Sequence, residues 1–420
     1  MLKKFLIWSQ KYTHLDMIYF TTGGFWLVTA QLVSLIASLA LSIVFARYLS
    51  KEVYGNYSFL QTAFSLLTVF SLPGINTAIL QAVAAGDDSA VPKAIRTRIK
   101  WGLIGSFAAF GMSVFYFVTG NPTLSLGFVI LGVFISILNP SSVYDAILQG
   151  KKAFALNTKF FIISQIVSSF FLVTSIIITN NLFVILLTYF SINSLFNLVF
   201  LKITLGKLKI TKDSDDNKVV LYGKQLSALN IINTIAGYLD KILVFHFLGA
   251  ASLSVYTFAI APPEQIKAIF GSLHILTFPK FAERPVEEIK RDVSAHILKI
   301  AAIAVVCVGG YILAAPTIYK LFFPNYLAAV SYSQVFSLSL LNLVLYPAAT
   351  YMLAKKKIRQ QYTVEICTSI LQIISMYFFI IWWGLWGLVL SRVLIRFFGA
   401  GFYAILFYRE TVPSKSIGNL

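Results

Sequence analysis

The sequence predicts an all-α integral membrane protein with twelve transmembrane helices arranged as two six-helix lobes around a central cavity. Three observations predict this class: an apolar composition, twelve long apolar stretches, and an alternation of basic and nearly uncharged connections between them. Of the 420 residues, 58% are hydrophobic and only 12% are charged, and the mean hydropathy is +0.80. This composition excludes a soluble domain of such length.

Each apolar stretch has roughly 20 residues or more, which is enough to cross about 30 Å of hydrocarbon as a helix. The first stretch is a full-length span that follows a basic segment, so we expect it to stay in the membrane and not to be cleaved as a signal peptide. In order along the chain, the stretches cover residues 24–46, 58–82, 101–119, 124–148, 154–178, 182–201, 225–247, 253–279, 297–318, 327–353, 362–382 and 385–407.

Lysine and arginine concentrate in alternate connections. The N-terminus and the connections after even-numbered spans hold most of them, whereas the connections after odd-numbered spans hold only Arg47, Lys51 and Lys320. Because basic residues in short loops are retained in the cytoplasm, this predicts a multi-pass protein of the plasma or inner membrane with both termini cytoplasmic. The net charge of +18 then reflects this bias and an attraction to the lipid bilayer, and it gives no reason to expect nucleic-acid binding.

A cytoplasmic linker at 206–222 separates six spans from six others. It predicts an N-terminal lobe of residues 1–205 and a C-terminal lobe of residues 223–420. A short pattern recurs in the two lobes: Tyr-Ser-Phe at 57–59 matches Tyr-Thr-Phe at 256–258, which lies 199 residues later.

A second pattern agrees with the first. Span four carries Pro140 and Tyr144 before a basic connection, and span ten carries Pro347 and Tyr351 before another. Matches at equivalent ordinal positions favour a duplicated bundle. Because each half holds an even number of spans, the halves are expected to be parallel repeats related by an axis along the membrane normal. A cavity between two such bundles can open to either side in turn, which is the architecture of a transporter.

Three segments carry a family resemblance: FARYLSKEVYGNY at 45–57, AILQGKK at 146–152 and LDKIL at 239–243. They resemble the oligosaccharide flippases of the multidrug/oligosaccharidyl-lipid/polysaccharide exporter superfamily. The resemblance implies a transporter that moves undecaprenyl-pyrophosphate-linked oligosaccharide from the cytoplasmic to the outer leaflet, for cell-surface polysaccharides such as lipopolysaccharide or capsule. It also implies a polymerase and glycosyltransferases of the same pathway as partners.

Few ionisable side chains fall inside the predicted spans. At bilayer depth such groups cost several kcal/mol, so those present usually face a protein interior or an aqueous cavity. The candidates are Asp240 and Lys241 in span seven, Glu264 and Lys267 in span eight, and Arg392 and Arg396 in span twelve.

Arg392 and Arg396 share one face of their span and have no acidic partner within it. One interpretation is that both bind a lipid pyrophosphate, because guanidinium binds phosphate oxygens in bidentate fashion, with Lys241 and Lys267 as additional point charges. The alternative pairs the arginines with the carboxylates of spans seven and eight, or with a lipid headgroup.

Glu264 and Lys267 have the i, i+3 spacing of a neutralising pair. Pro262 and Pro263 directly precede them, and we expect these prolines to interrupt the helix. A broken helix beside charged groups is a candidate substrate or ion site. Asp240 and Glu264 are also candidate sites for a coupling ion, Na⁺ or H⁺.

Arg47 lies at the predicted outer interface, where the family motif favours a gating or structural role. No metal site or other cofactor is expected, since Cys307 and Cys367 are isolated in separate spans and no histidine pair has ligand spacing. No phosphate-binding loop for ATP is present either. We predict no catalytic residue and no enzymatic activity.

Three other functions remain open at this stage. An ion-coupled multidrug exporter of the same superfamily is expected to have an acidic, apolar lumen, and a lipid II flippase usually carries extra spans. A membrane glycosyltransferase or polymerase needs a catalytic acid or base and a sizeable outer loop. The outer connections predicted here are too short for such an enzyme.

Overall fold

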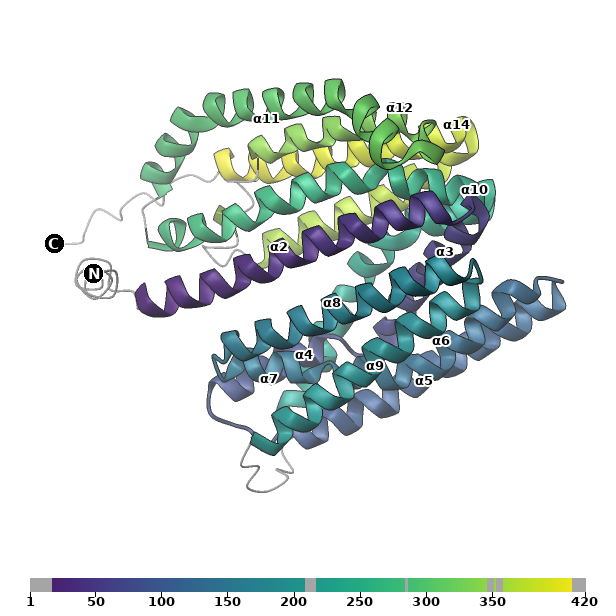
Figure 1. Ribbon diagram of the computed structural model, residues 1–420. Coiled ribbons are helices and arrows are strands. Elements are labelled where there is room, and N and C mark those ends of the chain that lie inside the picture. Colours follow the sequence, from purple (N-terminus) through teal and green to yellow (C-terminus); the bar gives the residue numbers. More distant parts are fainter. Residues whose placement is uncertain (1–16, 208–216, 284–285, 346–350, 353–357, 410–420) are drawn as a thin grey trace. The chain divides into compact units, whose positions relative to one another are not determined.

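The computed structural model of the protein describes residues 17–207, 217–283, 286–345, 351–352 and 358–409. Within these residues all regular structure is α-helix or short 3-10 helix, and no strand occurs (Figure 1). Among the described residues, eight stretches of helix are long and apolar enough to cross a membrane, and there are nine if a bent pair of shorter helices is counted as one span. The chain is therefore an all-α, multi-pass membrane protein, as predicted.

Two of the eight long helices hold two predicted spans each. Helix α10 (Lys218–Glu283) leaves helical geometry at Gly249, and α14 (Ile358–Arg409) leaves it at Gly384. Both glycines have positive φ, 81° and 56°, which glycine adopts at no steric cost. Each lies in a connection expected between spans, so a single glycine turn replaces a loop at both places.

The chain divides into two compact units, Met1–Ile231 and Ile232–Leu420. The predicted linker lies just before this division, and its residues 208–216 are outside the described part of the chain. Unit 1 contains α2 (Met17–Tyr48), α3 (Lys51–Leu67), η1 (Thr68–Ser71), α4 (Gly74–Ala84), α5 (Val91–Val118), α6 (Pro122–Ser141), α7 (Val143–Gly150), α8 (Phe154–Ile178), α9 (Leu182–Lys207) and the start of α10.

Close packing in unit 1 depends on small residues. Helix α5 packs along α6, α6 packs on α9, and α2 packs on α8 (Figure 1). A Cβ atom at Gly132 of α6 would lie 2.6 Å from the Phe110 ring of α5. A side chain at this position would displace the Phe110 ring, so glycine lets the ring lie directly against α6.

The second predicted span is broken in the structure. Between η1 and α4 the chain passes through Leu72, which has a left-handed φ of 53°, and Pro73, and the flanking helices are bent by 53°. Arg98, one of the basic residues that follow this span, is buried in unit 1 and only 3% exposed. Its Nε donates to the Ser71 carbonyl (3.1 Å) and its Nη1 to Asn76 Oδ1. The guanidinium thus satisfies backbone that the break leaves open.

Unit 2 contains most of α10, α11 (Val286–Phe322), η2 (Pro324–Tyr326), α12 (Ala329–Ser337), η3 (Leu338–Leu345) and α14. The η3 helix packs on both α11 and α14, and α12 packs on the same two helices. Predicted span ten falls on α12 and η3, and its residues 346–350 and 353, with Pro347, are outside the described residues.

The expected interruption at Pro262 and Pro263 was wrong, because α10 continues through both prolines. Proline at 262 removes the N–H that would bond the Phe258 carbonyl one turn earlier. The Tyr319 hydroxyl of α11 donates to that carbonyl at 2.8 Å instead. A side chain from a neighbouring helix therefore replaces the missing backbone donor and keeps the helix intact.

Aromatic contacts recur at matching places in the two units. The Tyr144 and Phe200 rings lie 5.5 Å apart at 68°, and 207 residues later the Tyr351 and Phe407 rings lie 4.9 Å apart at 67°. The first pair joins the fourth predicted span to the sixth, and the second pair joins the tenth to the twelfth. This recurrence supports the duplicated bundle inferred from sequence.

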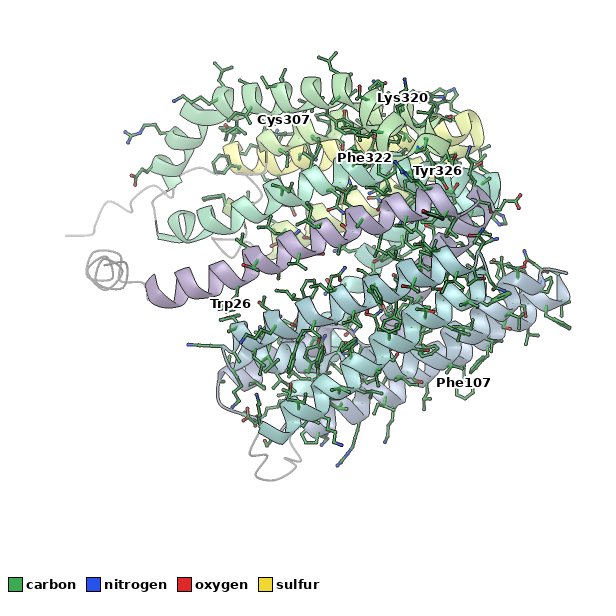
Figure 2. All side chains as sticks on the ribbon, in the orientation of Figure 1. Trp26, Phe107, Cys307, Lys320, Phe322 and Tyr326 are labelled. Atoms are coloured by element: carbon green, nitrogen blue, oxygen red, sulfur yellow. The ribbon has the colours of Figure 1, made fainter. Side chains whose placement is uncertain are left out.

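Large apolar side chains cover much of the outer surface. Phe107 is 72% exposed and points away from α5 (Figure 2), and Leu313 of α11 is 82% exposed. A soluble protein rarely exposes so many large apolar residues on contiguous helix faces. In this chain the pattern fits helices that face lipid.

Candidate functional site

Unit 2 brings the candidate residues of three predicted spans into one cluster. Asp240 lies nine residues before the turn at Gly249, and Tyr256 lies seven residues after it, so both sit roughly 10–14 Å from the turn. Arg392 follows the turn at Gly384 by eight residues, at a similar depth. Two helical hairpins thus place these groups opposite one another inside the span.

Asp240 is the fixed centre of the cluster. It is fully buried, and it accepts a hydrogen bond from the Tyr256 hydroxyl at 2.6 Å. Its Oδ2 also forms an ion pair with Arg392. The Arg392 Nη1 lies 3.4 Å from the Tyr256 hydroxyl oxygen, so carboxylate, phenol and guanidinium hold one another.

Glu264 joins the two arginines. Arg392 Nη2 lies 3.5 Å from Glu264 Oε1, and Arg396 Nη2 forms an ion pair with the same oxygen. The Arg396 Nη1 also donates to Ser339 Oγ at 3.0 Å. Both guanidinium groups lie over the buried Phe336 ring, at 5.7 and 4.8 Å from its centroid. Carboxylates and guanidinium groups thus alternate in the order Asp240, Arg392, Glu264, Arg396. The Phe336 ring makes a cation–π contact with each arginine.

In this structure the arginines make the contacts that the second interpretation predicts. Arg392 and Arg396 pair with the carboxylates of predicted spans seven and eight. The i, i+3 pair of Glu264 and Lys267 does not form as an ion pair, because Glu264 is engaged by the arginines. The broken helix expected beside that pair is absent as well.

Lys241 and Lys267 lie at the edge of the cluster. Lys241 is within electrostatic range of Asp240, Arg392 and Glu264, and Lys267 is within range of both arginines and Glu264. Neither ammonium group forms an ion pair within 4.0 Å in the part of the chain that the structure describes. Together these four cations and two carboxylates carry a net charge of +2.

The remaining predicted site residue, Arg47, lies elsewhere. It is exposed in the last turn of α2, in unit 1. The cluster, by contrast, is made of residues of unit 2.

Sequence reasoning missed three members of the cluster. Tyr256 belongs to the repeat and to the family resemblance but was not predicted as a site residue, and no sequence pattern indicated Phe336 or Ser339. Phe336 lies in α12 and Ser339 in η3, so their alignment under the arginines depends on how these two elements pack against α14, which no local sequence pattern predicts. A second polar contact was also missed: Asn233 Nδ2 donates to Glu365 Oε2 at 3.1 Å, joining α10 and α14 in unit 2.

No group of three or more His, Cys, Asp or Glu side chains that could hold a metal ion occurs among the described residues. The cluster can therefore be described by its chemistry alone. It is a partly buried, net-positive set of donors whose guanidinium groups present hydrogen bonds suited to carboxylate or phosphate oxygens.

Comparison with known proteins now decides the family. Residues 20–284 match the family model of polysaccharide biosynthesis proteins. The chain belongs to this family. The match covers more than half of the chain and includes the cluster residues of α10, whereas the arginines of α14 lie beyond it. The sequence matches no curated protein.

Solved structures show which fold this family member has. An inward-facing multidrug resistance MATE family transporter of the MOP superfamily superposes with a TM-score of 0.65 at 14% identity, over 89% of this chain and 94% of its own. The lipid II flippase MurJ in an inward closed conformation gives 0.61 at 14% identity, over 91% and 87%. A MOP superfamily transporter from Pyrococcus furiosus, described as having a binding pocket of reverse polarity, gives 0.52 at 14% identity, over 94% and 95%. The fold is that of the MOP superfamily.

Proposed function

We propose that the protein is a flippase for undecaprenyl-pyrophosphate-linked oligosaccharide, acting in the synthesis of a cell-surface polysaccharide. The family match and the MOP superfamily fold support a lipid-linked flippase or exporter of this superfamily. The observation that carries the substrate class is the charge of the cluster. The four cations of the cluster outnumber its two carboxylates by two, and a diphosphate that links a lipid to a sugar carries two negative charges.

In this proposal Lys241 and Lys267 supply the uncompensated charge, and Arg392 and Arg396 supply directional hydrogen bonds. The glycan passes through an aqueous path, and the prenyl tail stays in or near the lipid. Movement of the lobes exposes the diphosphate first to the cytoplasmic and then to the outer side. Both termini are cytoplasmic, and the polymerase and glycosyltransferases of the pathway act before and after this step.

The coupling ion is part of the same proposal. Asp240 and Glu264 are the carboxylates at membrane depth, and either Na⁺ or H⁺ could be exchanged against substrate at one of them. Transport under an imposed gradient of each ion separates these two choices. A chain that transports equally well without either gradient would argue against coupling.

The test is delivery of a lipid-pyrophosphate oligosaccharide across vesicles containing the purified protein. We expect wild type to deliver it, and the double variant Lys241→Ala with Lys267→Ala to lose at least about tenfold, since each removed charge weakens a charge-assisted contact. Lys320→Ala removes an exposed cation from a predicted outer connection and serves as the control, with wild-type delivery expected.

The outcomes separate the proposal from its rivals. Full delivery by the double variant would contradict the site assignment. No delivery by wild type, together with efflux of a cationic drug from the same vesicles, would favour the multidrug exporter. Cysteine labelling of the connections at Lys151 and Lys207 from the cytoplasmic side tests the orientation.

A further inference from the structure

The two carboxylates of the cluster are held in different ways. Asp240 has no exposed side-chain surface and is bonded by both Tyr256 and Arg392. Glu264 has 32% of its side chain exposed, and in the described part of the chain its ion pairs are those with the two arginines. Removing Asp240 from its contacts would leave it buried without compensation, whereas Glu264 can turn toward solvent at little cost.

Glu264 also occupies a distinctive position. The Nη2 atoms of Arg392 and Arg396 converge on a single oxygen, Oε1 of Glu264. Two guanidinium groups that meet at one anionic oxygen form the arrangement that a phosphate oxygen would take up. Lys267, one turn away on the same helix, adds a positive charge to that place.

We propose that Glu264 is an internal competitor that fills the anion site until a lipid diphosphate displaces it. This inference rests on the proposed function, because it takes a polyprenyl diphosphate as the ligand of the arginines. Asp240 stays in place and keeps Arg392 oriented during the exchange. The competitor gives the site selectivity, since only an anion that binds both arginines better than one carboxylate can enter.

Displacement has a measurable consequence. A carboxylate that competes for the arginines lowers the apparent affinity of the protein for the diphosphate. Neutralising Glu264 should therefore make the diphosphate bind more tightly. A side chain that merely supports the fold would give the opposite result. The direction of the change therefore distinguishes the two roles.

The experiment measures binding of farnesyl diphosphate, a short polyprenyl diphosphate, to the full-length protein in nanodiscs. Farnesol is the uncharged comparison probe. We expect Glu264→Gln to bind the diphosphate about tenfold more tightly than wild type, the effect of losing one charge-assisted competing contact. Glu264→Asp keeps the negative charge and should bind like wild type. Glu365→Gln removes a partly exposed carboxylate of unit 2 that contacts Asn233 and Gln361, and it should leave binding unchanged.

Each outcome has a defined meaning. Binding by wild type with equal or weaker binding by Glu264→Gln overturns the competitor and leaves the proposed function standing. No binding of the diphosphate by wild type, or equal binding of farnesol, counts against the proposed function itself. If Glu264→Gln unfolds, comparison of Glu264→Asp with Glu264→Ala decides, because alanine should then bind more tightly than aspartate.

Discussion

The two units share an aromatic framework and differ in their polar interiors. Tyr57 of unit 1 and Tyr256 of unit 2 are both buried and 199 residues apart. The hydroxyl of Tyr57 accepts a hydrogen bond from Gln61 at 3.0 Å, whereas that of Tyr256 donates to Asp240. Tyrosines at equivalent positions therefore bond to a neutral amide in unit 1 and to a carboxylate in unit 2.

The contrast extends to the neighbouring positions. By the 199-residue offset Leu41 corresponds to Asp240, and by the 207-residue offset of the last spans Ile185 and Tyr189 correspond to the two arginines of unit 2. Around these positions unit 1 has stacked and tilted rings, such as Phe64 against Phe190 at 4.7 Å. The aromatic framework thus tolerates either a neutral or an ionic interior, so the fold by itself does not dictate the chemistry of the site.

Unit 1 uses its one deeply buried arginine differently. Among its described contacts, Arg98 binds a backbone carbonyl and the amide oxygen of Asn76. It stabilises a helix break, whereas Arg392 and Arg396 take part in ion pairs. The comparison therefore predicts different energetic consequences when each kind of contact is removed.

The largest expected effect is at the centre of the ionic interior. Asp240→Ala removes the buried partner of Arg392, and breaking a buried pair from one side costs about 3–5 kcal/mol of unfolding free energy. Thermal unfolding of the purified protein, followed by tryptophan fluorescence, measures the loss. The double variant Asp240→Leu with Arg392→Leu removes both charges and should regain most of the stability. A loss below about 1 kcal/mol for Asp240→Ala would mean that the pair is not buried as described.

A smaller effect is expected where the buried cation has neutral partners. Arg98→Met leaves the Ser71 carbonyl and Asn76 without their donor, at a cost of about 2–3 kcal/mol for unsatisfied buried groups. No opposite charge is stranded, so the loss should be less than for Asp240→Ala in the same unfolding assay. Arg98→Gln keeps one donor and is expected to fall between wild type and Arg98→Met. An equal or larger loss than for Asp240→Ala would contradict the contrast between the units.

Much of the fold was predictable because it depends on local properties. Long apolar stretches specify spans, and a glycine between two of them, as at Gly249, permits a sharp turn. The all-α class, the multi-pass character and the family resemblance were all confirmed. The burial of Arg98 was not predictable, because a charge pattern registers a cation without showing that its hydrogen bonds are satisfied inside the protein.

The site was predictable as a set of residues but not as a set of contacts. Charges in apolar spans identified Asp240 and Arg392 as unusual. Their pairing depends on the rotation and relative height of α10 and α14, which no single helix encodes. The same reason explains the error at Pro262, because the Tyr319 hydroxyl that replaces the missing N–H comes from a different helix.

The hydrogen bond from the Tyr319 hydroxyl to the Phe258 carbonyl can be tested by mutation. Tyr319→Phe leaves the Phe258 carbonyl without its donor and should lower the unfolding free energy by about 1–2 kcal/mol. In a Pro262→Ala background the backbone N–H is restored, so the same change should cost less. The coupling between the two substitutions is the measurement. Equal costs in both backgrounds would show that the hydroxyl does not substitute for the N–H. Unit 1 has a proline break at Pro73, so the result also shows whether unit 2 avoids such a break through one side chain.

The smallest expected effect is at an ion pair on the surface of unit 1. Lys151 Nζ lies 2.5 Å from Asp88 Oδ2, and 38% of the Lys151 side chain is exposed. Water and salt screen such a pair, so Lys151→Ala should cost only about 0–1 kcal/mol, and less still at high salt. Lys207→Ala removes an exposed cation and is the matched control. If Lys151→Ala lowered the unfolding free energy as much as Asp240→Ala, the contribution of an ion pair would not depend on its burial. A small effect means that burial, and not the presence of opposite charges, distinguishes the ionic interior of unit 2.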